Sequence, residues 1–129
     1  MRTVALVAER PSRIDKLLDD ARADLDRVVP ERLADEVAAG ALLVDIRPAA
    51  NREQEGDLPG AVVIERIHLE WRLDPSSDHR IAEAAADRRV IVVCNEGYAS
   101  SLAAATLRQL GVARATDLIG GYRAWRALP

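Results

Sequence analysis

Short apolar runs alternate with longer amphipathic segments along most of this chain. Four runs rich in branched side chains are bounded by glycine, proline or charged residues: residues 41–46, 61–64, 90–93 and 115–119. Runs of this length without polar alternation are typical of strands buried on both faces of a parallel sheet. The pattern predicts an α/β domain with a central, mostly parallel sheet, and right-handed crossovers would place helices on both faces.

The N-terminal part of the chain has the spacing of an amphipathic helix. Over residues 12–28, apolar side chains recur three and four positions apart, and Ser12 and Asp15 have the spacing of a capping box. This helix precedes the first apolar run. We therefore divide the chain into a helical extension, residues 1–29, and one domain, residues 30–129.

Further helices are expected between the strands. Pro30 suits the first turn of a helix that Gly40 would end. The other helical segments are residues 100–110, residues 121–128 and a stretch that ends at residues 87–89. Residues 3–8 are either a short strand or a lead-in to the first helix, and the sequence does not decide between them.

Composition and charge exclude several classes of function. The formal net charge is −3 and no basic run occurs, so we expect no nucleic-acid partner. The apolar runs are too short to span a bilayer, so we expect no membrane partner. His68 and His79 lack metal-ligand spacing, and Cys94 is the single cysteine, so we expect no metal site and no internal disulfide. This cysteine usage fits a reducing compartment, and the expected location is the cytoplasm.

The position of Cys94 makes it a candidate for chemistry. It lies directly after the apolar run of residues 90–93, where that predicted strand ends. In open α/β sheets the carboxyl ends of the strands meet at one edge, and ligands bind there. Three further features follow predicted strands: Asp45 to Arg47, Glu65 with Arg66, and Gly120 with Gly121. We therefore predict that Cys94, Arg47, Arg66 and Gly120 gather at one edge of the sheet.

The segment from Cys94 to Ser101 has the components of a thiolate site. A free thiol is mostly protonated at neutral pH, and only the thiolate is a strong nucleophile. Gly97 permits the positive φ that turns successive backbone N–H groups toward one anion. Ser100 or Ser101 can cap the following helix, whose dipole favours negative charge at its N-terminus. This segment favours a nucleophilic cysteine over a cysteine that only fills the core.

Four segments resemble those of the rhodanese family, in the family's order. The loop Cys-x-x-Gly at Cys94 resembles its active-site loop, and the others are LLVDIRP at 42–48, EGDLPGAVVI at 55–64 and DLIGGYRAW at 117–125. Together they span about residues 30–129. The resemblance implies an α/β fold with a five-stranded, mostly parallel sheet flanked by helices on both faces. It also implies a sulfurtransferase in which Cys94 carries sulfane sulfur as a persulfide.

The resemblance and the loop together suggest a set of site residues. Cys94 is the expected catalytic residue, taking sulfur from a small donor and passing it to a thiol, on a small molecule or on a protein. Residues expected to contact the substrate are Asn95, Glu96, Gly97, Tyr98, Ala99, Ser100, Arg66 and Arg72. Asp45 and Arg47 are expected to be structural, and Trp71 and Trp125 are expected to be packing anchors. No cofactor is expected.

Three positions depart from the family's pattern. Ala99 occupies the place of the arginine that closes the loop, and Asp57 that of the histidine in the second segment. Glu96 adds a negative charge inside the loop. Without arginine's bidentate fork, a doubly charged donor is held less strongly, so we expect weak activity on thiosulfate. Arg66 and Arg72 are candidates for the missing cation, although ion pairs with neighbouring carboxylates are an equally simple role.

Two alternatives to a sulfurtransferase share the predicted fold. Cysteine phosphatases need an arginine six positions after the cysteine to hold a phosphate, and here that position is Ser100. The second alternative is a non-catalytic module that recognises a protein partner, with Ala99 as the mark of lost catalysis. The presence of Cys94 favours the enzyme, because inactive members of the family often replace this residue.

Overall fold

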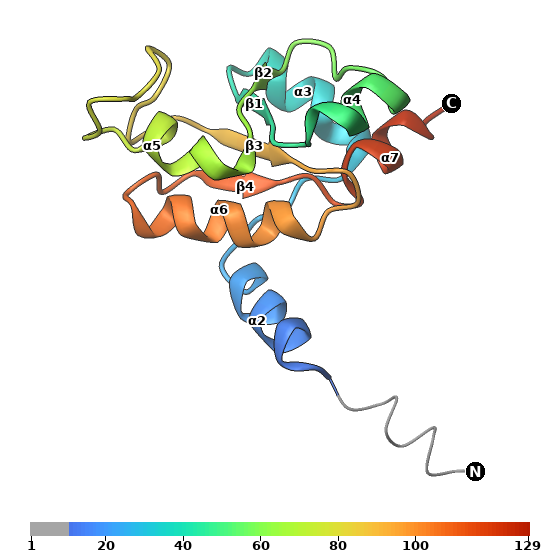
Figure 1. The fold of residues 1–129 in the computed structure, drawn as a ribbon, viewed down its shortest axis with the longest axis horizontal. Coiled ribbons are helices and arrows are strands. Elements are labelled where there is room, and N and C mark those ends of the chain that lie inside the picture. Colours follow the sequence, from blue (N-terminus) through green and yellow to red (C-terminus); the bar gives the residue numbers. More distant parts are fainter. Residues whose placement is uncertain (1–10) are drawn as a thin grey trace.

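The computed structural model describes residues 11–129, and the segment at residues 3–8 lies outside them. The four predicted apolar runs all contain strands, which are β1 (Leu42–Asp45), β2 (Val62–Val63), β3 (Val90–Val93) and β4 (Ala115–Asp117). All neighbouring strands pair in parallel, in the order β2-β1-β3-β4. The predicted α/β domain with a parallel sheet is therefore confirmed (Figure 1).

The predicted fifth strand is absent from residues 11–129, where the sheet has four strands. Beyond β4 there is a single parallel bridge between Val28 and Leu118. The Val28 N–H donates to the Asp117 carbonyl at 3.0 Å, and the Ile119 N–H donates to the Val28 carbonyl at 2.8 Å. This bridge holds the chain at Val28 extended, so the edge of the sheet is covered by one residue instead of a strand.

The same bridge explains why the first helix is shorter than predicted. Helix α2 spans Arg13–Arg22, whereas the apolar spacing predicted a helix to residue 28. Its start is as expected: Ser12 and Asp15 form a reciprocal capping box. The chain leaves the helix after Arg22, since a helical residue 28 could not pair with the sheet edge.

Side chains of the strands alternate between two hydrophobic clusters, one on each face of the sheet. Val44 and Val92 point to a cluster that helices α5 and α6 cover, while Leu43 and Ile91 point to a cluster that α3 and α7 cover. The helices are α3 (Leu33–Ala38), α5 (Leu69–Leu73), α6 (Ala99–Gln109) and α7 (Gly121–Arg126). Figure 1 shows α5 and α6 on one side of the sheet and α3 and α7 on the other. The predicted two-sided cover is confirmed.

Three helical features differ from the sequence-based expectation. The expected helical stretch ending at residues 87–89 consists of turns, since only Ile81 and Ala84 of this alanine-rich segment pack against the core. Two short helices were not predicted, α4 (Ala49–Glu55) and α5, together with the 3₁₀ turn η2 (Arg66–His68). The helix expected from Pro30 begins with the 3₁₀ turn η1 (Pro30–Arg32) before α3.

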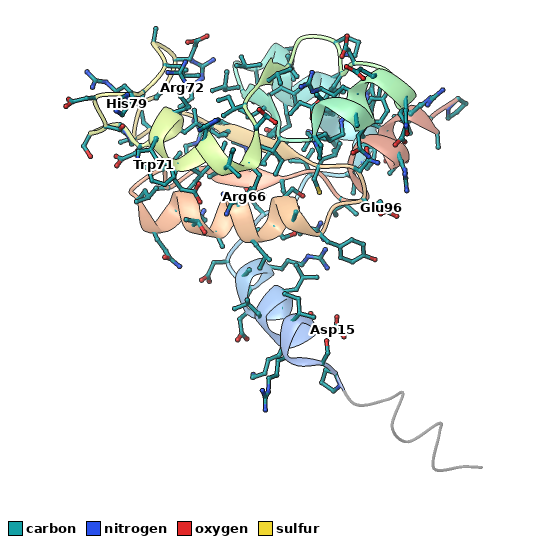
Figure 2. The ribbon with its side chains drawn as sticks, viewed as in Figure 1. Asp15, Arg66, Trp71, Arg72, His79 and Glu96 are labelled. Carbon is teal, nitrogen blue, oxygen red and sulfur yellow. The ribbon has the colours of Figure 1, made fainter. Side chains whose placement is uncertain are left out.

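The two tryptophans have different environments. Trp125 is partly buried and packs against Tyr122, with ring centroids 5.6 Å apart. Trp71 is 59% exposed, so its predicted role as a packing anchor is wrong. Because α5 has only five residues, its buried face is filled by Leu69 and Leu73, and Trp71 is left on the outer face (Figure 2).

Candidate active site

The carboxyl ends of three strands surround one small cavity. It has a volume of about 310 Å³, and Cys94 after β3, Arg47 after β1 and Arg66 after β2 all line it. Gly120 approaches the same loop, because a β-carbon placed on Gly97 would lie 2.7 Å from the Gly120 nitrogen. The four residues predicted to gather at this edge of the sheet therefore lie together.

The backbone of the loop is turned toward the Cys94 sulfur. Sγ accepts hydrogen bonds from the N–H groups of Gly97 at 3.2 Å and Ser100 at 3.3 Å. Gly97 has φ of +86°, the left-handed conformation that the sequence analysis expected of it. The sulfur also faces the N-terminus of α6, so two donors and a helix dipole act on one atom. These donors and the dipole are directed at the place where negative charge would develop on the sulfur.

The predicted serine cap of α6 is wrong. Helix α6 begins at Ala99 after Tyr98, and no side chain caps it. Ser100 and Ser101 lie inside the first turn, fully buried, and both hydroxyls donate to Asp117 Oδ2 at 2.7 Å. The Cys94 sulfur accepts one of the free N–H groups of this turn instead, which is the contact that a capping side chain normally makes.

The N-terminus of α7 donates two backbone hydrogen bonds to the loop that contains Cys94. The Tyr122 N–H donates to the Cys94 carbonyl at 2.8 Å, and the Arg123 N–H donates to the Asn95 carbonyl at 3.1 Å. Gly121 has φ of +64°, and a β-carbon on it would lie 2.5 Å from the Cys94 carbonyl oxygen. The glycine pair therefore lets the helix backbone approach the loop closely.

We expect Gly121→Ala to destabilise the protein by more than about 2 kcal/mol, because it adds backbone strain and a clash with the loop. Gly111→Ala is the matched control: Gly111 also has positive φ, +96°, but has open space around its α-carbon. Urea unfolding of both variants measures the difference. Equal losses of stability would show that the close approach to Cys94 adds nothing beyond strain.

Asn95 and Glu96 are held by charged groups of α4 and α7. Asn95 Nδ2 donates to Glu55 Oε2 at 2.8 Å, and Glu55 also pairs with Arg123 at 3.0 Å. The hydrogen bond from Arg123 and then that from Asn95 lower the pKa of Glu55 from 4.5 to about 2. Glu96 lies 3.3 Å from the same Arg123, so its negative charge is partly neutralised away from the cavity.

This depressed pKa predicts an acid-sensitive contribution to stability. The ionised Glu55 stabilises the folded state above pH 4.5, and this contribution is lost as the pH falls toward 2. Glu55→Gln should therefore lower the free energy of unfolding at neutral pH and flatten its decline over this window. Glu53→Gln, an exposed position on the same helix, is the control. Urea titrations at several pH values measure both, and identical slopes for the two variants would contradict the assignment.

The two arginines proposed as substitutes for the loop cation have different positions. Arg66 lines the cavity, but both Glu70 oxygens lie 2.8 Å from its Nη1. Arg72 does not line the cavity and donates to the His79 carbonyl at 2.8 Å. Figure 2 shows Arg72 beside His79 at one end of the molecule, with Arg66 near the middle and Glu96 toward the other end. Of these two arginines, only Arg66 lines the cavity.

Asp45 and Arg47 form a buried ion pair beside the cavity. Arg47 donates to Asp45 through Nε and Nη2, at distances down to 2.8 Å, and also to the Gly56 carbonyl at 2.9 Å. Both side chains are almost fully buried, and the guanidinium lies 3.8 Å from the Tyr122 ring centroid. These contacts tie β1 to α4 and α7, which is a structural role.

Tyr98 and Ala99 form the exposed part of the loop. Ala99 lines the cavity, whereas Tyr98 points outward, is 61% exposed and lies 5.6 Å from the Arg22 guanidinium. His68 and His79 are exposed, as expected. Within residues 11–129, no group of three or more histidine, cysteine or acidic side chains could hold a metal ion.

A buried polar network behind the loop was not predicted from the sequence. Its centre is Asp117 at the end of β4, which binds both serines of α6 and pairs with Arg27 at 2.8 Å. Arg22 and Arg27 each donate to the Gly97 carbonyl, at 2.7 and 3.0 Å. The position of Asp117 at a strand end was the available signal. Nothing in the sequence pointed to the two arginines, which lie at least 70 residues before their partners in the loop.

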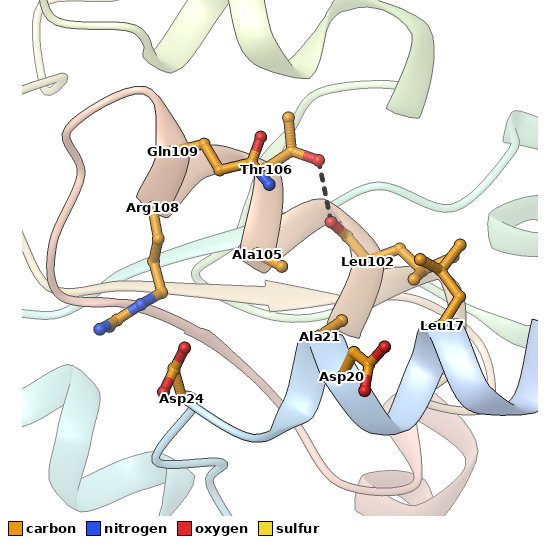
Figure 3. A pocket seen from close by; sticks show the side chains of 9 residues that line it. All are labelled: Leu17, Asp20, Ala21, Asp24, Leu102, Ala105, Thr106, Arg108 and Gln109. Atoms are coloured by element: carbon orange, nitrogen blue, oxygen red, sulfur yellow. Dashed lines mark hydrogen bonds between the residues drawn. The ribbon is translucent and has the colours of Figure 1, made fainter.

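A larger cavity lies elsewhere, between α2 and α6. It has a volume of about 520 Å³ and is lined by side chains such as Leu17, Leu102 and Arg108 (Figure 3). No residue that lines it was a candidate for chemistry. The smaller cavity is the candidate site, because the single cysteine of the sequence lines it.

Comparison with known proteins establishes the family. The model of the rhodanese-like domain matches residues 29–128. This protein belongs to the rhodanese-like family. A sulfurtransferase of Allochromatium vinosum is 39% identical over 95 residues, covering 74% of this chain and 78% of the relative. Thiosulfate sulfurtransferase GlpE of Pseudomonas savastanoi pv. phaseolicola is 34% identical over 104 residues, covering 81% and 90%.

A solved structure shares the fold of this chain. A protein of Rhodopseudomonas palustris, described as of unknown function and a possible tyrosine phosphatase, superposes with a TM-score of 0.80 at 29% identity, covering 89% of both chains.

This chain spans only about a fifth of two longer relatives. They are the adenylyltransferase and sulfurtransferase proteins MOCS3-2 of Zea mays and MOCS3 of Arabidopsis thaliana, of which it covers 17% and 20%. In residues 11–129, each helix is too short or too polar to cross a membrane.

Proposed function

We propose that this protein is a sulfurtransferase that carries sulfane sulfur as a persulfide on Cys94 and passes it to a nucleophilic acceptor. The observation that carries the proposal is the Cys94 sulfur itself, which borders a cavity of about 310 Å³ while two backbone N–H groups donate to it. The relatives from A. vinosum and P. savastanoi are named sulfurtransferases, which supports the same conclusion.

The chemistry needs two displacements at sulfur. The Cys94 thiolate attacks the outer sulfur of the donor, the new Sγ–S bond forms, and the donor's S–S bond breaks with its electron pair leaving on the donor fragment. An acceptor thiolate then attacks the outer sulfur of the persulfide. The Sγ–S bond breaks, and its electron pair returns to Sγ as the thiolate. Both steps need stabilisation of negative charge near the loop, which the inward N–H groups supply.

The charges around the cavity disfavour thiosulfate as the donor. Of the lining residues, Arg47 is neutralised by Asp45 and Arg66 by Glu70. Ala99 supplies no charge, and Glu65 adds a carboxylate to the lining. A doubly charged donor would therefore find no uncompensated cation among the lining residues. We infer a donor whose reacting group carries less charge than thiosulfate, such as an organic persulfide, in which the reacting sulfur atoms bear at most one negative charge.

The rim of the cavity suits an organic acceptor. Ile67 lines the cavity and is 71% exposed, and Ile46, Pro48 and Ala99 add apolar atoms to the lining. Apolar side chains at the mouth favour contact with carbon atoms of a small thiol or of a protein that carries one. A thiol that must remain reduced between turnovers also favours a reducing compartment such as the cytoplasm.

The alternatives have less support. The phosphatase suggested for the R. palustris protein requires a phosphate-binding arginine, but Ser100 occupies that position and its hydroxyl is directed to the Asp117 carboxylate. A purely structural binding module would have no need for donors aimed at Sγ. The arrangement of Gly97 and Ser100 around Cys94 therefore favours the enzyme.

Intact-mass spectrometry tests the proposal. After incubation with glutathione persulfide and removal of the excess donor, the protein should gain about 32 Da, one sulfur atom, and lose it when a thiol is added. Thiosulfate at the same concentration should give a much smaller fraction of this species. If no sulfane donor, including inorganic polysulfide, produces the adduct, the sulfurtransferase assignment is wrong.

A further inference from the structure

The side chain of Ser100 links the Cys94 sulfur to the buried carboxylate of Asp117. The thiol of Cys94 donates to Ser100 Oγ at 3.2 Å, and the Ser100 hydroxyl donates to Asp117 Oδ2 at 2.7 Å. Ser100 and Asp117 are fully buried, so water does not compete for these contacts. The chain of hydrogen bonds therefore runs in one direction, from the thiol to the carboxylate.

Ionisation of the thiol reverses what Ser100 must do. A thiolate only accepts hydrogen bonds, so an oxygen lone pair that faces it is repulsive. Rotation of the Ser100 hydroxyl toward sulfur would replace this repulsion with a third hydrogen bond, in addition to those from the N–H groups of Gly97 and Ser100. The rotation moves one hydrogen atom and leaves the backbone in place.

Asp117 can lose the Ser100 hydroxyl without becoming unsatisfied. Ser101 Oγ donates to Oδ2 at 2.7 Å, and Arg27 donates to Oδ1 at 2.8 Å and to Oδ2 at 3.2 Å. The carboxylate therefore keeps both oxygens bonded when Ser100 turns away. The cost of the rotation is small because a buried acceptor is not left without partners.

Charged groups face the loop from every element packed against it. Asp117 comes from β4, Arg22 from α2, and Arg27 from the segment before η1. On the cavity side lie the pairs of Arg47 with Asp45 and Arg66 with Glu70, and Arg123 pairs with Glu55 and Glu96 at the start of α7. Arg22 donates to two neutral acceptors, Ser101 Oγ and the Gly97 carbonyl, and Glu65 adds a carboxylate to the cavity lining. The other charges are paired, and none of these groups makes the contact that Ser100 makes with the sulfur.

From this geometry we infer that Ser100 is a hydroxyl switch that positions and stabilises the Cys94 sulfur, with Asp117 as its resting acceptor and Arg27 of the N-terminal extension as the anchor of Asp117. The switch donates to Asp117 when Cys94 is a thiol and to Sγ when the sulfur is negative. The effect on sulfur transfer rests on the proposed function, since Sγ becomes the leaving thiolate when the acceptor attacks the persulfide. The effect of Ser100 on ionisation of the free thiol is independent of the proposed function.

The two serines provide a matched pair of variants. Ser100→Ala and Ser101→Ala each remove one 2.7 Å hydrogen bond to Asp117 Oδ2. Ser100→Ala also removes the hydroxyl beside the sulfur, whereas Ser101→Ala removes an acceptor of Arg22, which still donates to the Gly97 carbonyl. The measurement is the rate of iodoacetamide alkylation of Cys94 as a function of pH, because only the thiolate reacts. Thermal unfolding shows whether losing a contact with Asp117 lowers the stability of the two variants by the same amount.

We expect the midpoint of the pH–rate profile to rise by about one to two pH units in Ser100→Ala, the equivalent of one hydrogen bond to a charged group. In Ser101→Ala it should remain within about 0.3 units of the unchanged protein, a shift that corresponds to less than half a kcal/mol. If both midpoints rise alike, the carboxylate network acts as a whole and the switch is wrong. It is equally wrong if neither midpoint moves.

A second measurement follows the transfer step in the same proteins. Each is loaded with sulfur from glutathione persulfide, and the rate of sulfur release to dithiothreitol is recorded. Ser100→Ala should release sulfur about ten-fold more slowly than Ser101→Ala, in line with the lost contact to the leaving sulfur. If the alkylation midpoints separate but no variant can be loaded, the switch stands and the sulfurtransferase proposal fails.

Discussion

Replacement of Cys94 by serine is expected to abolish persulfide formation and to reduce sulfur transfer by at least about a thousand-fold, the order of loss typical of removing a nucleophile. Cys94 is the only cysteine in the sequence, so no second thiol can take over the sulfur. A serine hydroxyl stays protonated at neutral pH and forms no stable bond to sulfane sulfur under these conditions. The rate of transfer from glutathione persulfide to dithiothreitol measures the loss.

The same variant should remain folded, which makes the result interpretable. A serine oxygen can accept the N–H groups of Gly97 and Ser100 that now point to sulfur, and the site is 9% exposed. We expect the free energy of unfolding to change by less than about 1.5 kcal/mol, as for other near-isosteric changes. Sulfur transfer that persists in a folded Cys94→Ser protein would exclude the covalent mechanism and favour the binding module.

Replacement of Ala99 by arginine is expected to raise kcat/KM for thiosulfate by about ten- to hundred-fold, the equivalent of one charge-assisted hydrogen bond of roughly 1.5–3 kcal/mol. Ala99 is exposed, lines the cavity and is the first residue of α6. A long side chain at this position therefore has room and can reach a donor bound next to the Cys94 sulfur. Turnover of glutathione persulfide should change less, because its reacting group bears only one negative charge. Steady-state kinetics with thiosulfate and with glutathione persulfide measure the two effects.

Two further variants separate the possible causes of this gain. Ala99→Lys carries the same charge without the planar fork, and we expect it to recover less than the arginine does. Glu96 competes for the new guanidinium, although its pairing with Arg123 at 3.3 Å already occupies part of its charge. Adding Glu96→Gln should therefore increase the gain only modestly, by less than about ten-fold. If thiosulfate turnover stays flat in all these backgrounds, the cation is not the missing feature.

The parts of this structure that follow local rules could be predicted from the sequence. The four parallel strands follow from apolar runs, and the positive φ of Gly97 follows from a loop that joins a strand to a helix within six residues. The capping box of Ser12 and Asp15 depends on residues three positions apart. In each case the signal lies within a short stretch of the sequence, so spacing and residue type are sufficient evidence.

Other predictions failed because a distant segment competed with a local preference. The helix expected to reach residue 28 ends at Arg22, because Val28 pairs with Leu118, and the alanine-rich stretch before residue 89 has too few large side chains to hold a helix against the core. Arg66 and Arg72 looked equivalent in the sequence. They lie six positions apart, at the start of η2 and near the end of α5, which leaves Arg66 at the cavity and turns Arg72 toward His79.

The sequence alone determined the parallel α/β sheet and the placement of its one thiol at a strand end, since both depend on periodicity and on the order of the elements. Only the tertiary structure decided what surrounds that thiol. Arg22 and Arg27 reach the Gly97 carbonyl from 75 and 70 residues away, and Asp117 reaches Ser100 across the β4–α6 contact. Buried polar groups form hydrogen bonds with partners that tertiary packing brings within about 3 Å, and residue spacing along the sequence does not predict those partners.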